Sequence, residues 1–282
     1  LDSGLQITIF TIITGSLLGI AYWSASIMVV SMISLSSLMS TAIYPKLLEG
    51  NNRSFVQSNL THLFFVGILL TAIAISLGQS ALFILNPIYV DAYYLVIILS
   101  IGSFFVVMRN IFKQMLTAIE TVDLNEKSTK KDYLKSKLFT VHTAQNIATA
   151  IIVISLVIGL IVLTETNTTI INYLEYWAFV VLVVEISLAF YLYVRIKQNF
   201  DLKFETFSIL KYSLVSAGIF GSLHYVTEIV LNYQSSIFDF VAILLVIIST
   251  GIIAYLFINY LIDYRSRELI NSIITELKNK SK

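Results

Sequence analysis

Long, nearly continuous runs of apolar residues dominate the chain, and short polar stretches separate them. A helix needs about 20 apolar residues to cross the hydrocarbon core of a bilayer. Eight runs approach or reach this length, at residues 2–16, 19–43, 60–85, 91–117, 138–163, 173–195, 207–231 and 238–262. Because the runs are continuous rather than alternating, they disfavour β-strands. The pattern therefore predicts an all-α, polytopic membrane protein with about eight transmembrane helices.

The polar stretches divide the chain into four parts. Residues 1–120 hold the first four predicted spans, and residues 138–263 hold the last four. The longest polar connection, TVDLNEKSTKKDYLKSK at 121–137, is expected to be a cytoplasmic linker. In the tail, 264–282, apolar residues recur at helical spacing between lysines and arginines, which predicts an amphipathic helix on the inner membrane surface.

The distribution of basic residues gives an orientation. Composition agrees with a membrane protein, with 57% hydrophobic and only 12% charged residues. All 18 Lys and Arg residues lie in, or close to, alternate connections and the tail. The intervening connections, at 15–18, 86–90, 164–172 and 232–237, contain none. Since Lys and Arg mark cytoplasmic loops, we expect a protein of the cytoplasmic membrane with both ends of this chain inside.

Four short motifs give the chain a family likeness. An acid, Asp2, precedes the first apolar run. The other three are Leu-Gly-Ile-Ala-Tyr at 18–22, Tyr-Pro-Lys at 44–46 and Asn-Pro-Ile-Tyr-Val-Asp-Ala at 86–92. Together they resemble the multidrug/oligosaccharidyl-lipid/polysaccharide (MOP) exporter superfamily, and especially its prokaryotic polysaccharide flippases. Asn86 departs from the family pattern, which has Gly at this position. The likeness covers about the first 120 residues and is only topological beyond them.

The resemblance implies a fold and a function. This chain would be the C-terminal lobe, helices 7–14 of a fourteen-helix transporter, and its partner would be an N-terminal lobe that the sequence lacks. Such transporters move cargo by alternating access. The expected cargo is a polyprenol-linked glycan, whose lipid tail stays among the membrane lipids. Three alternatives remain. One is a cation/drug antiporter of the same superfamily, and another is a membrane-embedded glycan polymerase or ligase, which the short outer connections disfavour. The third is a membrane scaffold that transports nothing.

Ionisable and polar residues inside the apolar runs are the candidate site residues, since such residues are costly in a membrane. Asp2 either lines the cavity or caps its helix. Glu185 stands mid-run with no base on a neighbouring turn, so it needs a partner on another helix or a proton. An inner polar group either binds the pyrophosphate of the carrier lipid or reaches lipid headgroups. It consists of Arg109, Asn110, Lys113 and Gln114, with His142, Gln145 and Asn146 at a similar depth.

Other chemistries find no support in the sequence. The chain has no cysteine, and its three histidines are scattered. It lacks a Walker A sequence, His-Glu-x-x-His and Gly-x-Ser-x-Gly. Nothing resembles a nucleic-acid-binding surface. We therefore expect a transporter rather than an enzyme, with no cofactor, no metal site and no nucleic-acid partner.

Overall fold

The fold is known from a computed structural model that describes residues 11, 17–41, 43–48, 53–120, 129–166, 169–198, 205–231 and 237–280. In these ranges every regular element is a helix, and seven helices are long and apolar enough to cross a membrane. Seven of the predicted apolar runs coincide with these helices to within a few residues, so those predictions are confirmed. The predicted span at 2–16, apart from Thr11, lies outside the described residues, as does Asp2.

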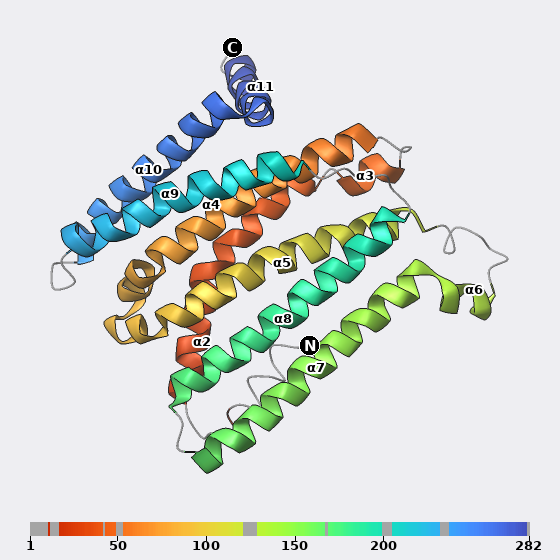
Figure 1. Ribbon diagram of the computed structural model, residues 1–282, viewed down its shortest axis with the longest axis horizontal. Helices are drawn as coiled ribbons and strands as arrows, with labels where there is room; N and C mark the ends of the chain where they lie inside the picture. Colours follow the sequence, from red (N-terminus) through yellow and green to blue (C-terminus); the bar gives the residue numbers. More distant parts are fainter. Residues whose placement is uncertain are drawn as a thin grey trace.

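Figure 1 shows how the helices are arranged. In chain order they are α2 (Leu17–Val30), the 3₁₀-helix η1 (Ser31–Ser40), α3 (Ile43–Leu48), α4 (Arg53–Leu85), the 3₁₀-helix η2 (Pro87–Ala92), α5 (Tyr93–Ala118), α6 (Lys130–Lys135), α7 (Lys137–Thr166), α8 (Ile170–Lys197), α9 (Thr206–Val230), α10 (Ile237–Ile262) and α11 (Tyr264–Lys280). The short helix α6 is an addition to the linker expected at 121–137. A capping box between Thr129 and Asp132 holds its first turn.

The first described span changes its winding halfway, from α-helix to 3₁₀-helix. A 3₁₀ run of ten residues is unusually long. Hydroxyl side chains accompany it, each donating to the carbonyl three residues earlier, as in Ser36 Oγ to Ile33 O at 2.7 Å. The same bond is made by Ser31, Ser34, Ser37, Ser40 and Thr41. These bonds give the hydroxyl groups hydrogen-bond acceptors, which the hydrocarbon of a lipid bilayer cannot supply.

The spans pack as two groups that meet at α4. One group places α5 between α8, α2 and η1, and α7 against α8. The other places α9 between α4 and α10 (Figure 1). Three buried apolar clusters follow this division, two in the first group and one joining α4 to α9 and α10. Helices from both sides of residues 121–137 therefore share their cores.

The sequence suggests an aromatic belt at the outer membrane surface, formed by Tyr22, Trp23, Tyr89, Tyr93, Tyr94, Tyr173, Tyr176 and Trp177. The structure divides these residues into two classes. Trp23 stacks on Trp177 with ring centroids 4.1 Å apart, and Tyr173 donates from its hydroxyl to Leu156 O. Trp177 and Tyr173 are each only 3% exposed. By contrast, Tyr94 is 66% exposed. The interpretation of all these aromatic residues as a lipid-facing belt is thus wrong for the buried ones, which join helices.

A buried carboxylate connects the last span to the tail helix. Asp263 accepts hydrogen bonds from Tyr212 Oη at 2.6 Å, Ser208 Oγ at 2.9 Å and the Ser266 amide at 3.2 Å. Lys211 Nζ lies 3.5 Å from Asp263 Oδ1. Burial alone would raise the pKa of Asp263, but these hydrogen bonds and the lysine outweigh it and hold the pKa below its ordinary value of 3.8.

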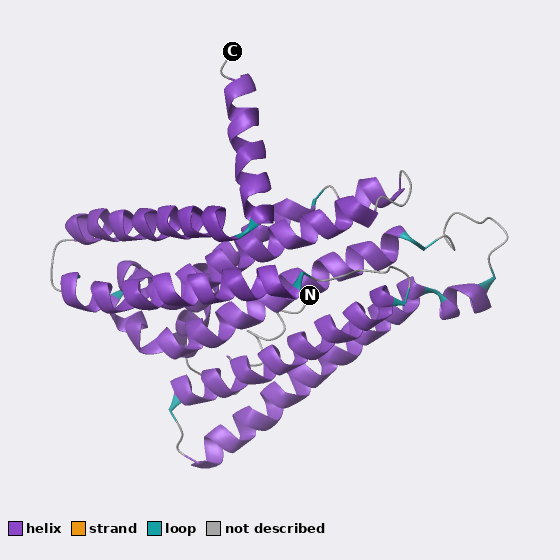
Figure 2. Cartoon of the chain, turned by 45° about the horizontal axis from the view of Figure 1, so that its top comes forward, coloured by secondary structure: helices purple, strands orange, loops and turns teal. Residues whose placement is uncertain are grey.

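From this junction α11 turns away from the direction of α10 (Figure 2). A two-pronged ion pair joins it to α9, because Arg265 Nε and Nη2 lie 3.1 and 2.9 Å from Glu205 Oε1. Leu269 is buried, whereas Ile273 and Ile274 on the next turn are exposed. The predicted tail helix is therefore confirmed, and its exposed apolar residues suit contact with a membrane surface.

Candidate functional site

The polar centre of the bundle is an ion pair between α5 and α8. Arg109 Nη1 lies 2.7 Å from Glu185 Oε1, and the two side chains are 19% and 9% exposed. Gly102 lies at the same interface, where a Cβ would be in ordinary van der Waals contact with Leu182 at 3.9 Å, about one turn before Glu185. The partner that Glu185 was expected to find on another helix is thus Arg109.

This ion pair leaves hydrogen-bonding capacity unused. Arg109 also donates from Nη2 to Asn110 Oδ1 at 3.3 Å. Within the described part of the chain, Arg109 Nε and Glu185 Oε2 are buried and have no hydrogen-bond partner. An unpaired donor and an unpaired acceptor at one buried site are costly. They mark a place where a proton, water or another polar group can bind.

A second polar contact lies one helical turn further along α5. Lys113 Nζ donates to Gln145 Oε1 on α7 at 2.9 Å. The structure thereby joins Lys113 to α7, as the similar depth of the two segments suggested. However, His142 and Asn146 are exposed on α7. Of the candidate residues, Arg109, Asn110, Lys113, Gln145 and Glu185 form or adjoin the interhelical polar contacts.

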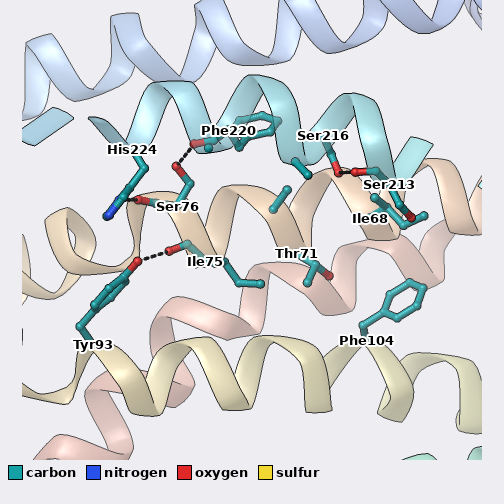
Figure 3. Close-up of a pocket in the computed structure, with 13 residues that line it drawn as sticks. Ile68, Thr71, Ile75, Ser76, Tyr93, Phe104, Ser213, Ser216, Phe220 and His224 are labelled. Atoms are coloured by element: carbon teal, nitrogen blue, oxygen red, sulfur yellow. Dashed lines mark hydrogen bonds between the residues drawn. The ribbon is translucent and has the colours of Figure 1, made fainter. Parts of the chain in front are cut away.

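A cavity of about 440 Å³ lies between α4, α5 and α9, and sequence reasoning missed it (Figure 3). Its lining is mainly apolar, with Ile68, Phe104 and Phe220 among the larger side chains. At one end His224 Nδ1 lies 3.0 Å from Ser76 O and Tyr93 Oη donates to Ile75 O, and Ser213 and Ser216 lie at the other end (Figure 3). Ser76 Oγ in turn donates to Phe220 O at 2.6 Å and so joins α4 to α9.

A signal for this cavity exists in the sequence of α9. It is the least apolar of the seven candidate spans. Small residues repeat along it where the cavity lies, at Ser213, Ser216, Ala217 and Gly221. Small side chains keep helices close but leave space beside them, which a bulky residue would fill. The spacing to His224 indicates one polar, small-residue face.

Comparison with known proteins adds no relative: no family, no curated protein and no solved structure matches this chain. The fold by itself defines the class. Seven long apolar helices in the described residues make the chain a polytopic, all-helical membrane protein. Its candidate site is the Arg109–Glu185 pair within the spans.

Proposed function

We propose that the chain is part of a membrane flippase or exporter that moves lipid-linked oligosaccharide or polysaccharide precursors across the cytoplasmic membrane by alternating access. The observation that carries this proposal is the Arg109–Glu185 pair. A purely structural contact inside a membrane rarely uses two full charges, because each must leave water. Charges are retained there when cargo, ions or protons must be bound and released.

The pair suits an anionic cargo. A guanidinium presents five N–H donors in a fork that fits the oxygens of a phosphate. Glu185 is then the resident partner of Arg109 when cargo is absent. Protonation of Glu185 would release the Arg109 guanidinium, which could then bind a pyrophosphate. After deprotonation, the Glu185 carboxylate would compete with the pyrophosphate for Arg109 and displace the cargo. The same exchange would couple cargo movement to a proton gradient.

The apolar cavity favours this cargo over an organic cation. Its lining contains no Asp or Glu, and His224 is its single ionisable group besides the Tyr93 phenol. An antiporter of cations requires a carboxylate at its binding cavity to neutralise the charge. A hydrocarbon chain carries no charge and needs no carboxylate in the cavity that binds it. The cavity of the described residues therefore supports a lipid-linked cargo better than the antiporter alternative.

The resemblance of the motifs to the MOP superfamily supports the same proposal and adds the N-terminal lobe as a partner. The test is made in cells that express the complete transporter with Arg109 replaced. Arg109→Gln should accumulate lipid-linked precursor on the cytoplasmic leaflet, and Arg109→Lys should do so less, since it keeps the charge but loses the fork. Clearance of precursor by Arg109→Gln at the parent's rate and expression level would refute the proposed role.

A further inference from the structure

A second cavity, of about 240 Å³, lies where the ends of α5 and α8 meet the beginning of α7. We call it the basic pocket, and its lining is Leu116, Lys137, Thr140, Val141, Tyr191, Arg195 and Gln198. Figure 1 shows the ends of α5 and α8 on the same side of the bundle as the beginning of α7, which directly follows the short helix α6. The cavity is smaller than the roughly 300–1,000 Å³ that is usual for drug-sized ligands. It is suited to a compact group.

The chemistry of the lining selects an anion. Lys137 and Arg195 come from different helices and line the same cavity. The hydroxyl residues Thr140 and Tyr191 and the amide residue Gln198 line it as well. Near it, the carboxylate of Glu120 accepts a hydrogen bond from the Lys137 amide at 2.6 Å. Among the described residues, the lining of the pocket itself holds two cationic side chains and no carboxylate.

Local contacts hold the arginine in place. Arg195 Nε donates to Tyr191 Oη at 3.2 Å, and its guanidinium carbon lies 5.4 Å from the centroid of the same ring. Tyr191 is four residues earlier on α8, so the two side chains lie on one helix face. Such positioning lowers the entropy that Arg195 would lose on binding an anion.

The surroundings indicate that the anion is attached to a lipid. Phe139, next to Thr140, is 48% exposed, and Val194, next to Arg195, is 40% exposed. The pocket thus lies at the ends of membrane spans with apolar side chains exposed beside it. Basic pockets between transmembrane helices at this depth bind the headgroups of anionic lipids.

We propose that the basic pocket binds the phosphate of an anionic phospholipid headgroup, with Arg195 and Lys137 as its cationic ligands and the acyl chains along Phe139 and Val194. This lipid site is separate from the Arg109–Glu185 pair and does not depend on the proposed transport function. Binding there would join α5, α7 and α8 at the ends that line the pocket.

The experiment uses the full chain in a neutral detergent and a short-chain fluorescent phosphatidylglycerol as probe. The double variant Lys137→Gln/Arg195→Gln should weaken probe binding about tenfold or more, because charge-assisted hydrogen bonds are lost. The matched control Lys130→Gln/Lys131→Gln removes the same charge from α6 and should leave binding within about twofold, as expected for exposed lysines outside the pocket. Arg195→Lys, a milder change, should give an intermediate loss and serves if the double variant does not fold.

Three results would overturn the proposal. Equal binding by parent and pocket variants would remove the site. An equal loss in the α6 control would reduce the effect to general electrostatic attraction. Inorganic phosphate could also displace the probe at a concentration at which phosphatidylcholine does not. That result would assign the pocket to a free anion instead of a lipid.

Discussion

Arg109 Nη1 lies 2.7 Å from Glu185 Oε1, although the two residues are 76 positions apart in the sequence and belong to different helices. The pair crosses the α5–α8 interface, which is the most extensive helix contact in the described structure. Its energetic behaviour is predictable from the chemistry of the two groups. A carboxylate can be neutralised by a proton, whereas a guanidinium in a protein cannot lose one.

The first prediction concerns the folding energy of this pair. Glu185→Gln leaves a permanent charge without its partner, so the variant should lose about 3–5 kcal/mol of stability. Arg109→Gln should lose less, because the remaining carboxyl can take up a proton. The double variant Arg109→Gln/Glu185→Gln should return to within about 1 kcal/mol of the parent, since no charge remains buried. Reversible unfolding in mixed detergent micelles measures all three, and additive losses would contradict the pairing.

The second prediction uses the Asp263 junction. Its pKa lies below the ordinary value, so its stabilising contribution is fully present above about pH 4 and is lost as the pH falls through the folded-state pKa. Asp263→Asn should therefore cost roughly 1.5–3 kcal/mol at neutral pH. The difference between parent and variant should shrink as the solution is acidified below pH 4.

The control for this experiment is Asp239→Asn, the same substitution at an exposed position at the other end of α10. It should change stability by less than about 0.5 kcal/mol at any pH. A cost for Asp263→Asn that stays constant down to pH 2 would show that packing, rather than the charge, stabilises the junction.

The third prediction concerns helix contact at Gly159. A Cβ at this position would lie 2.8 Å from Tyr173 Cε2 and 2.9 Å from Tyr176 Cε1. The half-exposed Tyr176 can move, but the buried Tyr173 is held by its bond to Leu156 O. Gly159→Ala should thus destabilise the α7–α8 contact by about 1–3 kcal/mol.

Gly218 offers the matched substitution, because a Cβ there would have no neighbour within 4 Å. Gly218→Ala should be neutral or stabilise by up to about 1 kcal/mol through helix propensity. Thermal unfolding of both variants in one detergent gives the comparison. Equal effects of the two substitutions would mean that α7 and α8 do not approach each other as described.

The fourth prediction concerns orientation in the membrane. The chain has no cysteine, so single cysteines can be introduced without background. Lys131 on α6 and Glu165 near the end of α7 are both exposed. In intact cells an impermeant thiol reagent should label Glu165→Cys and spare Lys131→Cys until the membrane is opened. Labelling of both in intact cells, or of Lys131→Cys alone, contradicts the placement of the basic connections inside.

The positions of the spans could be predicted from the sequence because each is a local property. An apolar run such as 238–262 has no other way to satisfy its backbone in lipid than as a helix, and α10 occupies Ile237–Ile262. The change to 3₁₀ winding at Ser31–Ser40 was not predicted, since it depends on hydroxyls that bond back to carbonyls. Hydropathy does not distinguish an α-helix from a 3₁₀-helix.

The candidate site was only half predictable. Glu185 and Arg109 stand out as charges in apolar runs, but the sequence offers no rule that pairs α5 with α8. The burial of Trp177 was missed for the same reason: interfacial depth predicts a lipid-facing ring, and its stacking on Trp23 depends on which helices are neighbours. The cavity beside His224 has only an indirect local signal, the small residues along α9, because its volume depends on how the helices pack.

The central claim is that Arg109 and Glu185 are retained for transport and not for folding. The double variant Arg109→Gln/Glu185→Gln separates the two, because it should fold as the parent does. The decisive measurement is translocation of a fluorescent lipid-linked oligosaccharide by the complete transporter in proteoliposomes, at equal amounts of folded protein. The account predicts at least a tenfold slower rate, as charge-assisted bonds to the cargo phosphate are lost. Translocation by the folded double variant at the parent's rate would contradict it.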